Sequence, residues 1–108
     1  MSDPVRLSHS SALILQSIGA AHHYGFDVMD VTGLPSGTVY PALRRLEQER
    51  LIVSRWEESS TAKQRPARKY YRLTRAGSTA LHSLQQRYPL LRHLVGQETA
   101  ARRRGVPA

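Results

Sequence analysis

The clearest hydrophobic pattern in the chain lies between Ser36 and Glu49. Apolar residues recur there at intervals of three and four, which places them on one face of a helix. These residues are Val39, Ala42, Leu43 and Leu46. Because the ring nitrogen of Pro41 cannot donate a hydrogen bond, the helix either begins effectively at Thr38 or has an irregular first turn from Ser36.

Two shorter helices are expected before this segment. Either Ser8 or Ser10 can accept a hydrogen bond from an amide in the first turn, so the first helix begins beside one of them. A dense apolar run follows and can bury more than one side of that helix. The second helix covers residues 24–32. Phe26 and Met29 are expected to face the core, and the inward orientation of Val28 is left open.

Two strands are expected after the three helices. Residues 51–57 and 68–74 are rich in β-branched and aromatic residues, and the polar residues 58–67 between them form a long tip. Tyr70 and Tyr71 should point to opposite faces of this hairpin, because side chains alternate along a strand. One tyrosine is therefore expected in the core and the other near solvent.

A final helix is expected after Thr74, whose side chain can cap it. Apolar residues at alternating gaps of three and four form a heptad seam along this helix. The seam consists of Leu81, Leu84, Tyr88, Leu91 and Val95. Pro89 should bend or break the helix. We expect the first part of the seam to pack on the first helix and the second part to form a homodimer interface.

The predicted order of three helices, two strands and one helix is the layout of a winged helix-turn-helix protein. The fold is therefore assigned to the α+β class and is mainly α. Residues 1–73 would form the winged domain, with three helices and a two-stranded β-wing. Residues 74–98 would form a C-terminal dimerisation helix, and residues 99–108 a flexible basic tail. A chain of 108 residues has room for one small core.

The charge of the chain indicates the class of its partner. There are 16 Lys and Arg residues against 8 Asp and Glu residues, so the formal net charge is +8 and the pI is near 10.8. Such a surplus of positive charge is typical of proteins that bind nucleic acid. The winged domain is accordingly interpreted as a DNA-binding domain.

The composition also excludes several classes of chemistry. The chain has no cysteine, so it has no disulfide, no thiolate metal site and no thiol nucleophile. Its five histidines are scattered or adjacent, which suits no metal site, and no catalytic constellation or cofactor motif is present. No apolar run is long enough to span a membrane, and no secretion signal begins the chain. We therefore expect a cytoplasmic protein that is not an enzyme.

The helix at residues 36–49 carries polar groups suited to the major groove of DNA, which admits one α-helix. Its candidate DNA contacts are Ser36, Thr38, Tyr40, Arg44 and Arg45. The hydroxyls can bond to phosphates or base edges. Arg44 can reach a guanine edge or the backbone, and Arg45 suits a phosphate. The structural alternative for Tyr40 is an aromatic ring packed against the second helix.

A second cationic cluster, without an acidic residue inside it, follows in the hairpin. Its candidate DNA contacts are Lys63, Gln64, Arg65, Arg68 and Lys69. A positive hairpin can follow the phosphate backbone or enter a minor groove. The structural alternative is a solvated loop, in which Arg68 or Lys69 only shields a strand edge.

Three blocks of sequence resemble one family of proteins. They are Tyr24-Gly-Phe-Asp-Val, Gly37-Thr-Val-Tyr-Pro-Ala-Leu-Arg-Arg-Leu-Glu47 and Arg68-Lys-Tyr-Tyr-Arg-Leu-Thr-Arg-Ala-Gly77. The chain is similar, over residues 8–95, to the PadR-like winged-helix transcription regulators with a single C-terminal helix. The resemblance implies a cytoplasmic repressor that binds operator DNA as a homodimer through that helix.

The resemblance also implies a possible small aromatic effector, because some members of the family sense flat aromatic compounds. Trp56 and Tyr88 are the candidates to stack on one, although the alternative for Trp56 is an anchor in the core or at its rim. Many members carry glycine where this chain has Arg50. That departure suggests a different helix cap or an added phosphate contact.

These observations predict a dimeric, sequence-specific transcriptional regulator, most simply a repressor. Its recognition helix at about residues 36–49 would enter the major groove, and its wing at residues 58–67 would lie on the backbone or in a minor groove. The alternative is a basic winged-helix module that binds RNA or a protein complex without operator specificity.

Overall fold

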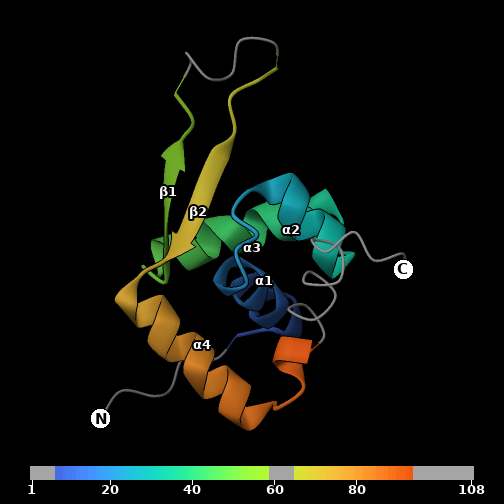
Figure 1. The fold of residues 1–108 in the computed structure, drawn as a ribbon, viewed down its shortest axis with the longest axis vertical. Helices are drawn as coiled ribbons and strands as arrows, with labels where there is room; N and C mark the ends of the chain where they lie inside the picture. Colours follow the sequence, from blue (N-terminus) through green and yellow to red (C-terminus); the bar gives the residue numbers. More distant parts are fainter. Residues whose placement is uncertain (1–6, 59–64, 94–108) are drawn as a thin grey trace.

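A computed structural model describes residues 7–58 and 65–93 (Figure 1). Its elements are α1 (His9–Gly19), α2 (Gly25–Thr32), α3 (Ser36–Gln48), β1 (Ile52–Trp56), β2 (Lys69–Leu73) and α4 (Arg75–Arg87). The strands form an antiparallel hairpin that projects beyond the helical layer. This order confirms the predicted succession of elements and the mainly helical α+β class. The proposed tail at residues 99–108 lies outside the described residues.

The ends of the first two helices follow from local chemistry. Ser8 caps α1, because its Oγ accepts a hydrogen bond from the Ser11 amide at 3.1 Å. Gly33 ends α2 with φ of 73°, a left-handed conformation that glycine adopts without steric cost. Its amide donates to the Met29 carbonyl. Both boundaries agree with the sequence pattern.

Helix α3 begins at Ser36, so Thr38 is not its cap. The amides of Thr38 and Val39 both donate to the Pro35 carbonyl, at 2.9 and 3.0 Å. Pro41 consequently lies in the second turn rather than the first. Its missing amide leaves the Gly37 carbonyl without the usual helical donor. Both residues are exposed, so water can fill that role.

Arg50 terminates α3 in the left-handed conformation, with φ of 63°. The Leu51 amide donates to the Leu46 carbonyl at 3.0 Å, which closes the helix with a Schellman-type turn. Glycine would take this φ with less strain. Arg50 therefore forms the same kind of helix cap that glycine would form, but with more backbone strain. The Arg50 carbonyl also accepts a hydrogen bond from the Thr74 hydroxyl.

Phe26 does not face the core, and that prediction was wrong. The ring is 71% exposed, whereas Val28 is fully buried and Met29 is partly buried. Phe26 lies two residues from Val28, which is roughly the opposite side of a helix. A helix of eight residues can present only one stripe to the core, and Val28 and Val31 supply it.

The hairpin register explains which of its side chains are buried. Tyr71 is opposite Ser54 on the inner face and is buried, whereas Tyr70 is half-buried, as the alternation predicted. Trp56 is opposite Lys69 on the same inner face but is 63% exposed. It is not a core anchor, because the strands extend past the helices at that point (Figure 1).

Helix α4 packs against its own chain. Leu81, Leu84 and Leu91 are buried in one hydrophobic cluster with residues of α1 and α3. Gln85 donates to the buried Gln16 of α1 at 2.8 Å. The helix ends just before Pro89, as predicted.

The residues in the second part of the predicted heptad seam, Tyr88, Leu91 and Val95, do not share one environment. Leu91 is only 5% exposed within the single chain, so it packs in its own core rather than offering a free surface. Tyr88 is 45% exposed. Val95 lies outside the described residues. Leu81 and Leu84 of α4, together with Leu91, therefore share the core of the winged domain.

Candidate nucleic-acid interface

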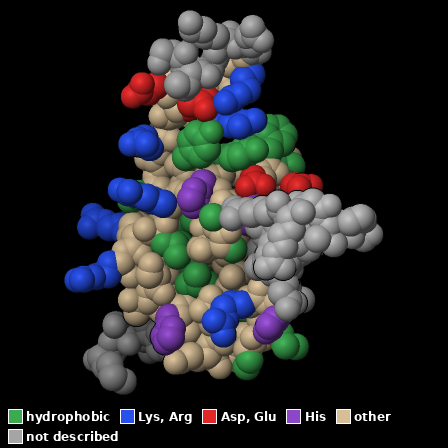
Figure 2. Space-filling view, in the orientation of Figure 1, with side chains coloured by type: hydrophobic (Ala, Val, Ile, Leu, Met, Phe, Trp, Pro, Cys, Tyr) green, Lys and Arg blue, Asp and Glu red, His purple; other side chains and the backbone are tan. Residues whose placement is uncertain are grey.

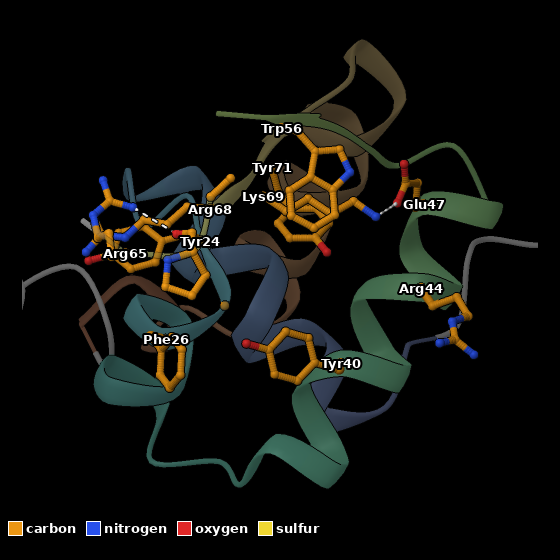
Figure 3. A pocket seen from close by; sticks show the side chains of 13 residues that line it. Tyr24, Phe26, Tyr40, Arg44, Glu47, Trp56, Arg65, Arg68, Lys69 and Tyr71 are labelled. Atoms are coloured by element: carbon orange, nitrogen blue, oxygen red, sulfur yellow. Dashed lines mark hydrogen bonds and ion pairs between the residues drawn. The ribbon is translucent and has the colours of Figure 1, made fainter. Parts of the chain in front are cut away.

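One cavity of about 510 Å³ lies between α2, α3 and the part of the hairpin that extends past the helices (Figure 3). Its lining comes from four elements and two loop segments. The lining residues are Tyr24, Gly25, Phe26, Tyr40, Arg44, Glu47, Trp56, Arg65, Pro66, Ala67, Arg68, Lys69 and Tyr71. Figure 2 shows hydrophobic side chains between the hairpin and α2, bordered by Lys and Arg side chains. The cavity therefore brings together two candidate contacts of α3, Tyr40 and Arg44, and three of the hairpin, Arg65, Arg68 and Lys69. Ser36, Thr38 and Arg45 do not line it.

The amino end of α3 is open. No side chain caps it, and Ser36 and Gly37 are exposed while Thr38 is half-buried. The first amides of a helix lack intrahelical acceptors and carry the positive end of the helix dipole, so they attract anions. The geometry of this end therefore suits a phosphate.

The two arginines of α3 project from its exposed side. Arg44 lines the edge of the cavity and makes no ion pair with any residue in the described part of the chain. Its guanidinium points away from the centre of the cavity in Figure 3. Arg45 is also exposed, in the last turn of the helix. Both charges can be presented to a polyanion.

Tyr40 packs against the start of α2, as the structural alternative proposed. A Cβ atom placed on Gly25 would lie 2.5 Å from the Tyr40 hydroxyl oxygen, so only glycine leaves room for this ring. Tyr40 nevertheless remains 42% exposed and lines the cavity. The ring is therefore held in position while one side stays accessible.

Arg65 has an acidic partner that the local sequence did not reveal. Its two terminal nitrogens donate to the two carboxylate oxygens of Glu57, at 2.8 and 2.9 Å. The Tyr70 hydroxyl also donates to Glu57, at 3.1 Å. The stretch from Lys63 to Lys69 contains no acidic residue, but the hairpin folds Glu57, just after β1, onto the returning segment.

Two further candidate contacts of the hairpin, Arg68 and Lys69, lie near aromatic rings. The Arg68 guanidinium is 4.4 Å from the centre of the Tyr24 ring. The Lys69 ammonium is 5.8 Å from the Trp56 ring and 5.7 Å from the Tyr71 ring. It is also 3.9 Å from a carboxylate oxygen of Glu47. Lys63 and Gln64 lie outside the described residues.

The Glu57 carboxylate is strongly stabilised in its charged form. Hydrogen bonds from Arg65, with further bonds from the Arg68 amide and the Tyr70 hydroxyl, lower its pKa from 4.5 to about 2. Because the folded pKa is lowered, the pair adds stability above pH 4.5. That contribution disappears as the pH falls from 4.5 toward 2.

Removing the Arg65 guanidinium should therefore move the titration of Glu57. In the Arg65→Gln variant, the pKa of Glu57 should rise toward its ordinary value, because the largest cause of the shift is lost. Carboxyl carbon chemical shifts measured against pH report this directly. Arg55→Gln, on the outer face of β1, is the matched control and should leave the midpoint near 2. Equal midpoints in the two variants would contradict the assigned pairing.

Sequence reasoning identified only part of the aromatic lining of the cavity. Phe26 was placed in the core, whereas Trp56 was a candidate to stack on an effector, with an anchor in the core or at its rim as the alternative. The orientation of Trp56 could be predicted in part, because side chains alternate along a strand and Trp56 therefore lies on the same face of β1 as Ser54. Its proximity to Tyr71 and Lys69 depends on the pairing of the two strands across a long loop. That pairing cannot be read from either strand alone.

Other kinds of site find no support in the described residues. The described residues contain no group of histidine and acidic side chains that could hold a metal ion. Nor does the described part of the chain contain a helix long and apolar enough to cross a membrane. His22 is buried and bonds to Asp27 at 2.7 Å, so it makes a structural contact at the start of α2 rather than a phosphate contact.

Comparison with known proteins identifies similar sequences and folds. The model of the transcriptional regulator PadR-like family matches residues 14–83. A PadR family transcription regulator from Clostridium difficile has 26% identity and a TM-score of 0.68, covering 85% of this chain and 99% of its own. A PadR-like transcription factor from Bacteroides fragilis has 29% identity and a TM-score of 0.57, with coverages of 81% and 90%.

A third solved structure agrees with these two. A PadR-like transcriptional regulator from Bacillus cereus has 27% identity and a TM-score of 0.59, covering 82% of this chain and 89% of its own. A comparison with curated protein sequences gives no match. The structural similarities confirm the winged-helix fold predicted from the sequence.

Proposed function

Because this chain belongs to the PadR-like family of transcriptional regulators, which are not enzymes, we propose that it represses transcription by binding operator DNA as a homodimer. The observation that carries the proposal is the shared side of α3 and the hairpin. Arg44 of α3 and the hairpin residues Arg65, Arg68 and Lys69 line one cavity. A duplex laid along this side would meet both elements. Such a regulator would act in the cytoplasm.

In this proposal α3 enters the major groove with its amino end directed at the DNA. The open first turn at Ser36 would bind a phosphate, and Thr38 would add a hydroxyl. Arg44 would reach a base edge, and Arg45 would neutralise the backbone. Tyr40 would contact the duplex with its exposed side while Gly25 supports the other. Arg44 would thus read the base sequence, and the other contacts of α3 would position the helix on the duplex.

The hairpin would bind the adjacent backbone or minor groove. Lys69 and Arg68 are held near their positions by aromatic rings, so little side-chain entropy would be lost when they meet phosphate. Arg65 is neutralised by Glu57 and would contribute less than its charge suggests. Lys63 and Gln64 at the tip remain proposed contacts. The wing would then add affinity for any duplex rather than base preference.

The exposed apolar surface after α4 is the proposed dimer interface. Leu81, Leu84 and Leu91 are already buried in their own chain, so they cannot supply much of an interface. Tyr88 and Leu90, on either side of Pro89, are large apolar residues that remain 45% and 68% exposed. A two-fold pair would bury them and set two recognition helices about 34 Å apart, one turn of DNA.

Replacing Tyr88 and Leu90 together by serine should give a monomer in sedimentation velocity, because this substitution removes the apolar surface without opening the core. The matched control is Val53→Ser, which removes an exposed apolar residue from the outer face of the hairpin and should leave the dimer intact. Lysine at Leu84 or Leu91 would not test the interface, since a buried charge would unfold the chain. Dimers that survive the double substitution would place the interface elsewhere.

A titration of the protein against duplex DNA at several salt concentrations tests the proposed function. One duplex carries the promoter of its own gene and the other has random sequence. Specific regulators bind their sites about 10³-fold or more tightly than random duplex, and their affinity falls with salt according to the number of phosphates neutralised. Equal affinity for the two duplexes, or tighter binding of RNA, would overturn the proposal of an operator-specific regulator.

A further inference from the structure

We propose that the hydrogen-bond donors gathered around Glu57 form a binding site for one backbone phosphate of DNA, and that the Glu57 carboxylate fills this site until a duplex displaces it. The displacement by DNA rests on the proposed function, whereas the anion site itself does not. The site lies where the returning segment of the hairpin meets the end of β1. Three properties of the site support the inference: its donors, its rigidity and its exposure.

Donors from three residues converge on the two oxygens of the Glu57 carboxylate. The terminal nitrogens of Arg65 donate to Oε1 and Oε2, at 2.8 and 2.9 Å. The Tyr70 hydroxyl donates to Oε2 at 3.1 Å, and the Arg68 amide makes a longer bond to Oε1 at 3.4 Å. Guanidinium, hydroxyl and backbone amide groups are the groups that proteins use to bind phosphate oxygens. The carboxylate therefore occupies a place in which a phosphate would find the same donors.

The backbone holds these donors in place without help from the carboxylate. The Glu57 amide donates to the Arg68 carbonyl at 2.7 Å, so the two segments stay paired when the Glu57 side chain turns away. Tyr70 pairs with Arg55 between the strands, and its ring packs edge-to-face with Tyr24, with 5.8 Å between the ring centres. A site whose donors are already positioned loses little conformational entropy when it binds an anion.

The Arg65 guanidinium is the accessible part of the site. The Arg65 side chain is 37% exposed, whereas the Glu57 side chain is 12% exposed. Arg65 lines one edge of the cavity, across from Arg44 (Figure 3), while Glu57 does not line the cavity. A phosphate that approaches the proposed DNA-binding side would therefore meet the guanidinium before it meets the carboxylate.

The site favours a negative charge, and a phosphate can supply that charge in place of the carboxylate. Bonds from Arg65 and its neighbours lower the pKa of Glu57 to about 2, so these donors strongly favour an anion. A phosphodiester carries the same charge on a similar pair of oxygens. Because an exposed ion pair in water is weak, the exchange of one anion for the other costs little. Glu57 would thus lower the affinity of the hairpin for any duplex without preventing its binding.

Dimethyl phosphate has the charge and the free oxygens of a DNA phosphate, so it tests the anion site without DNA. The probe is added to the full chain, and the Arg68 amide resonance is followed in a nitrogen-15 correlation spectrum. Glu57→Gln removes the competing charge and should bind the probe at least about tenfold more tightly than the wild type does. Sodium chloride at the same ionic strength is the control for screening.

Two double variants make the assignment specific. Adding Arg65→Gln to Glu57→Gln should abolish the saturable shift, because the main donor is lost. Adding Arg72→Gln instead removes one exposed charge from the outer face of β2 and should leave the shift unchanged. Far-ultraviolet circular dichroism verifies that each variant is folded. Equal affinity of the wild type and Glu57→Gln for the probe, or equal effects of Arg65→Gln and Arg72→Gln, would overturn the inference.

The displacement itself is measured on the wild-type protein with a duplex of random sequence. In the free protein the Glu57 carboxyl stays ionised down to pH 4.5, because its pKa is about 2. In the complex the carboxyl would lose Arg65 and lie close to phosphates, so its pKa should rise above its ordinary value of 4.5. Its carboxyl carbon chemical shift should then change between about pH 6 and pH 4.5 in the complex only. A carboxyl that stays ionised over this range in the complex would contradict the displacement.

The affinity for DNA gives a second measure of the same exchange. Glu57→Gln should bind the random duplex about threefold to tenfold more tightly than the wild type, because Arg65 no longer has to leave a partner. Arg65→Gln should for the same reason cost more affinity in the Glu57→Gln background than in the wild type. Equal costs in the two backgrounds would show that Glu57 does not hold Arg65 back from DNA.

These experiments separate the inference from the proposed function. If dimethyl phosphate binds as expected but no duplex binds, the anion site stands, while the displacement and the proposed function are both wrong. If the protein binds its own promoter specifically but the Glu57 carboxyl does not titrate in the complex, the displacement is wrong and the proposed function stands.

Discussion

Replacing Gly77 by alanine is expected to destabilise the fold by about 3 kcal/mol. A Cβ atom at this position would overlap the carbonyl oxygen of Leu51, a backbone atom that cannot move aside. The same carbonyl accepts the Thr74 amide at 3.0 Å, and Thr74 caps α4 through the Gly77 amide at 3.0 Å. A methyl group would thus separate α4 from the start of the hairpin.

Gly37→Ala is the matched control for Gly77→Ala. A Cβ atom at Gly37 meets nothing within 4 Å, and the residue lies in a helix, so alanine should raise stability by about 0.5–1 kcal/mol. Urea unfolding followed by circular dichroism measures both changes. Identical midpoints for Gly77→Ala and the wild type would show that α4 does not pack as closely on Leu51 as the structure has it.

Replacing Arg44 by alanine is expected to weaken operator binding by about 1–3 kcal/mol per base pair contacted and to relax base preference at one position of each half-site. The residue is exposed and makes no ion pair with the described residues, so its removal should leave the fold intact. Binding to a set of duplexes with single base changes measures both the affinity and the preference.

Arg55→Ala provides the control for charge alone. Arg55 is exposed on β1 and does not line the cavity, so its removal should change operator affinity little and base preference not at all. If Arg44→Ala lowers affinity equally for all duplexes, Arg44 contacts phosphate. If it behaves like Arg55→Ala, α3 does not present this face to DNA.

Local patterns in the sequence were sufficient for much of the fold. The apolar stripe of α3, the end of the second helix at residue 32 and the Thr74 cap each depend on interactions within a few residues, so each could be predicted. The cap of the first helix was narrowed to Ser8 or Ser10. The break before Pro89 follows from the chemistry of one residue. Phe26 was misplaced because a short helix with several apolar residues does not specify which stripe faces inward.

The candidate site depended on contacts between distant segments. Arg65 meets Glu57 only because the two strands pair across a long loop, and the pattern of cations in the loop contained no sign of that partner. Leu91 could not be assigned to its own core from the heptad seam, because the turn at Pro89 redirects the chain. The cavity between α3 and the hairpin arises from the same long-range packing.

The central claim is that α3 and the hairpin bind DNA on one common side. Amide chemical-shift changes on addition of a duplex selected from a random pool test it most directly. The proposal predicts the largest changes in the first turn of α3, at residues 36–38, and at residues 65–69 of the hairpin, with little change along α4. Changes concentrated on α4 or α1, with α3 unaffected, would contradict it.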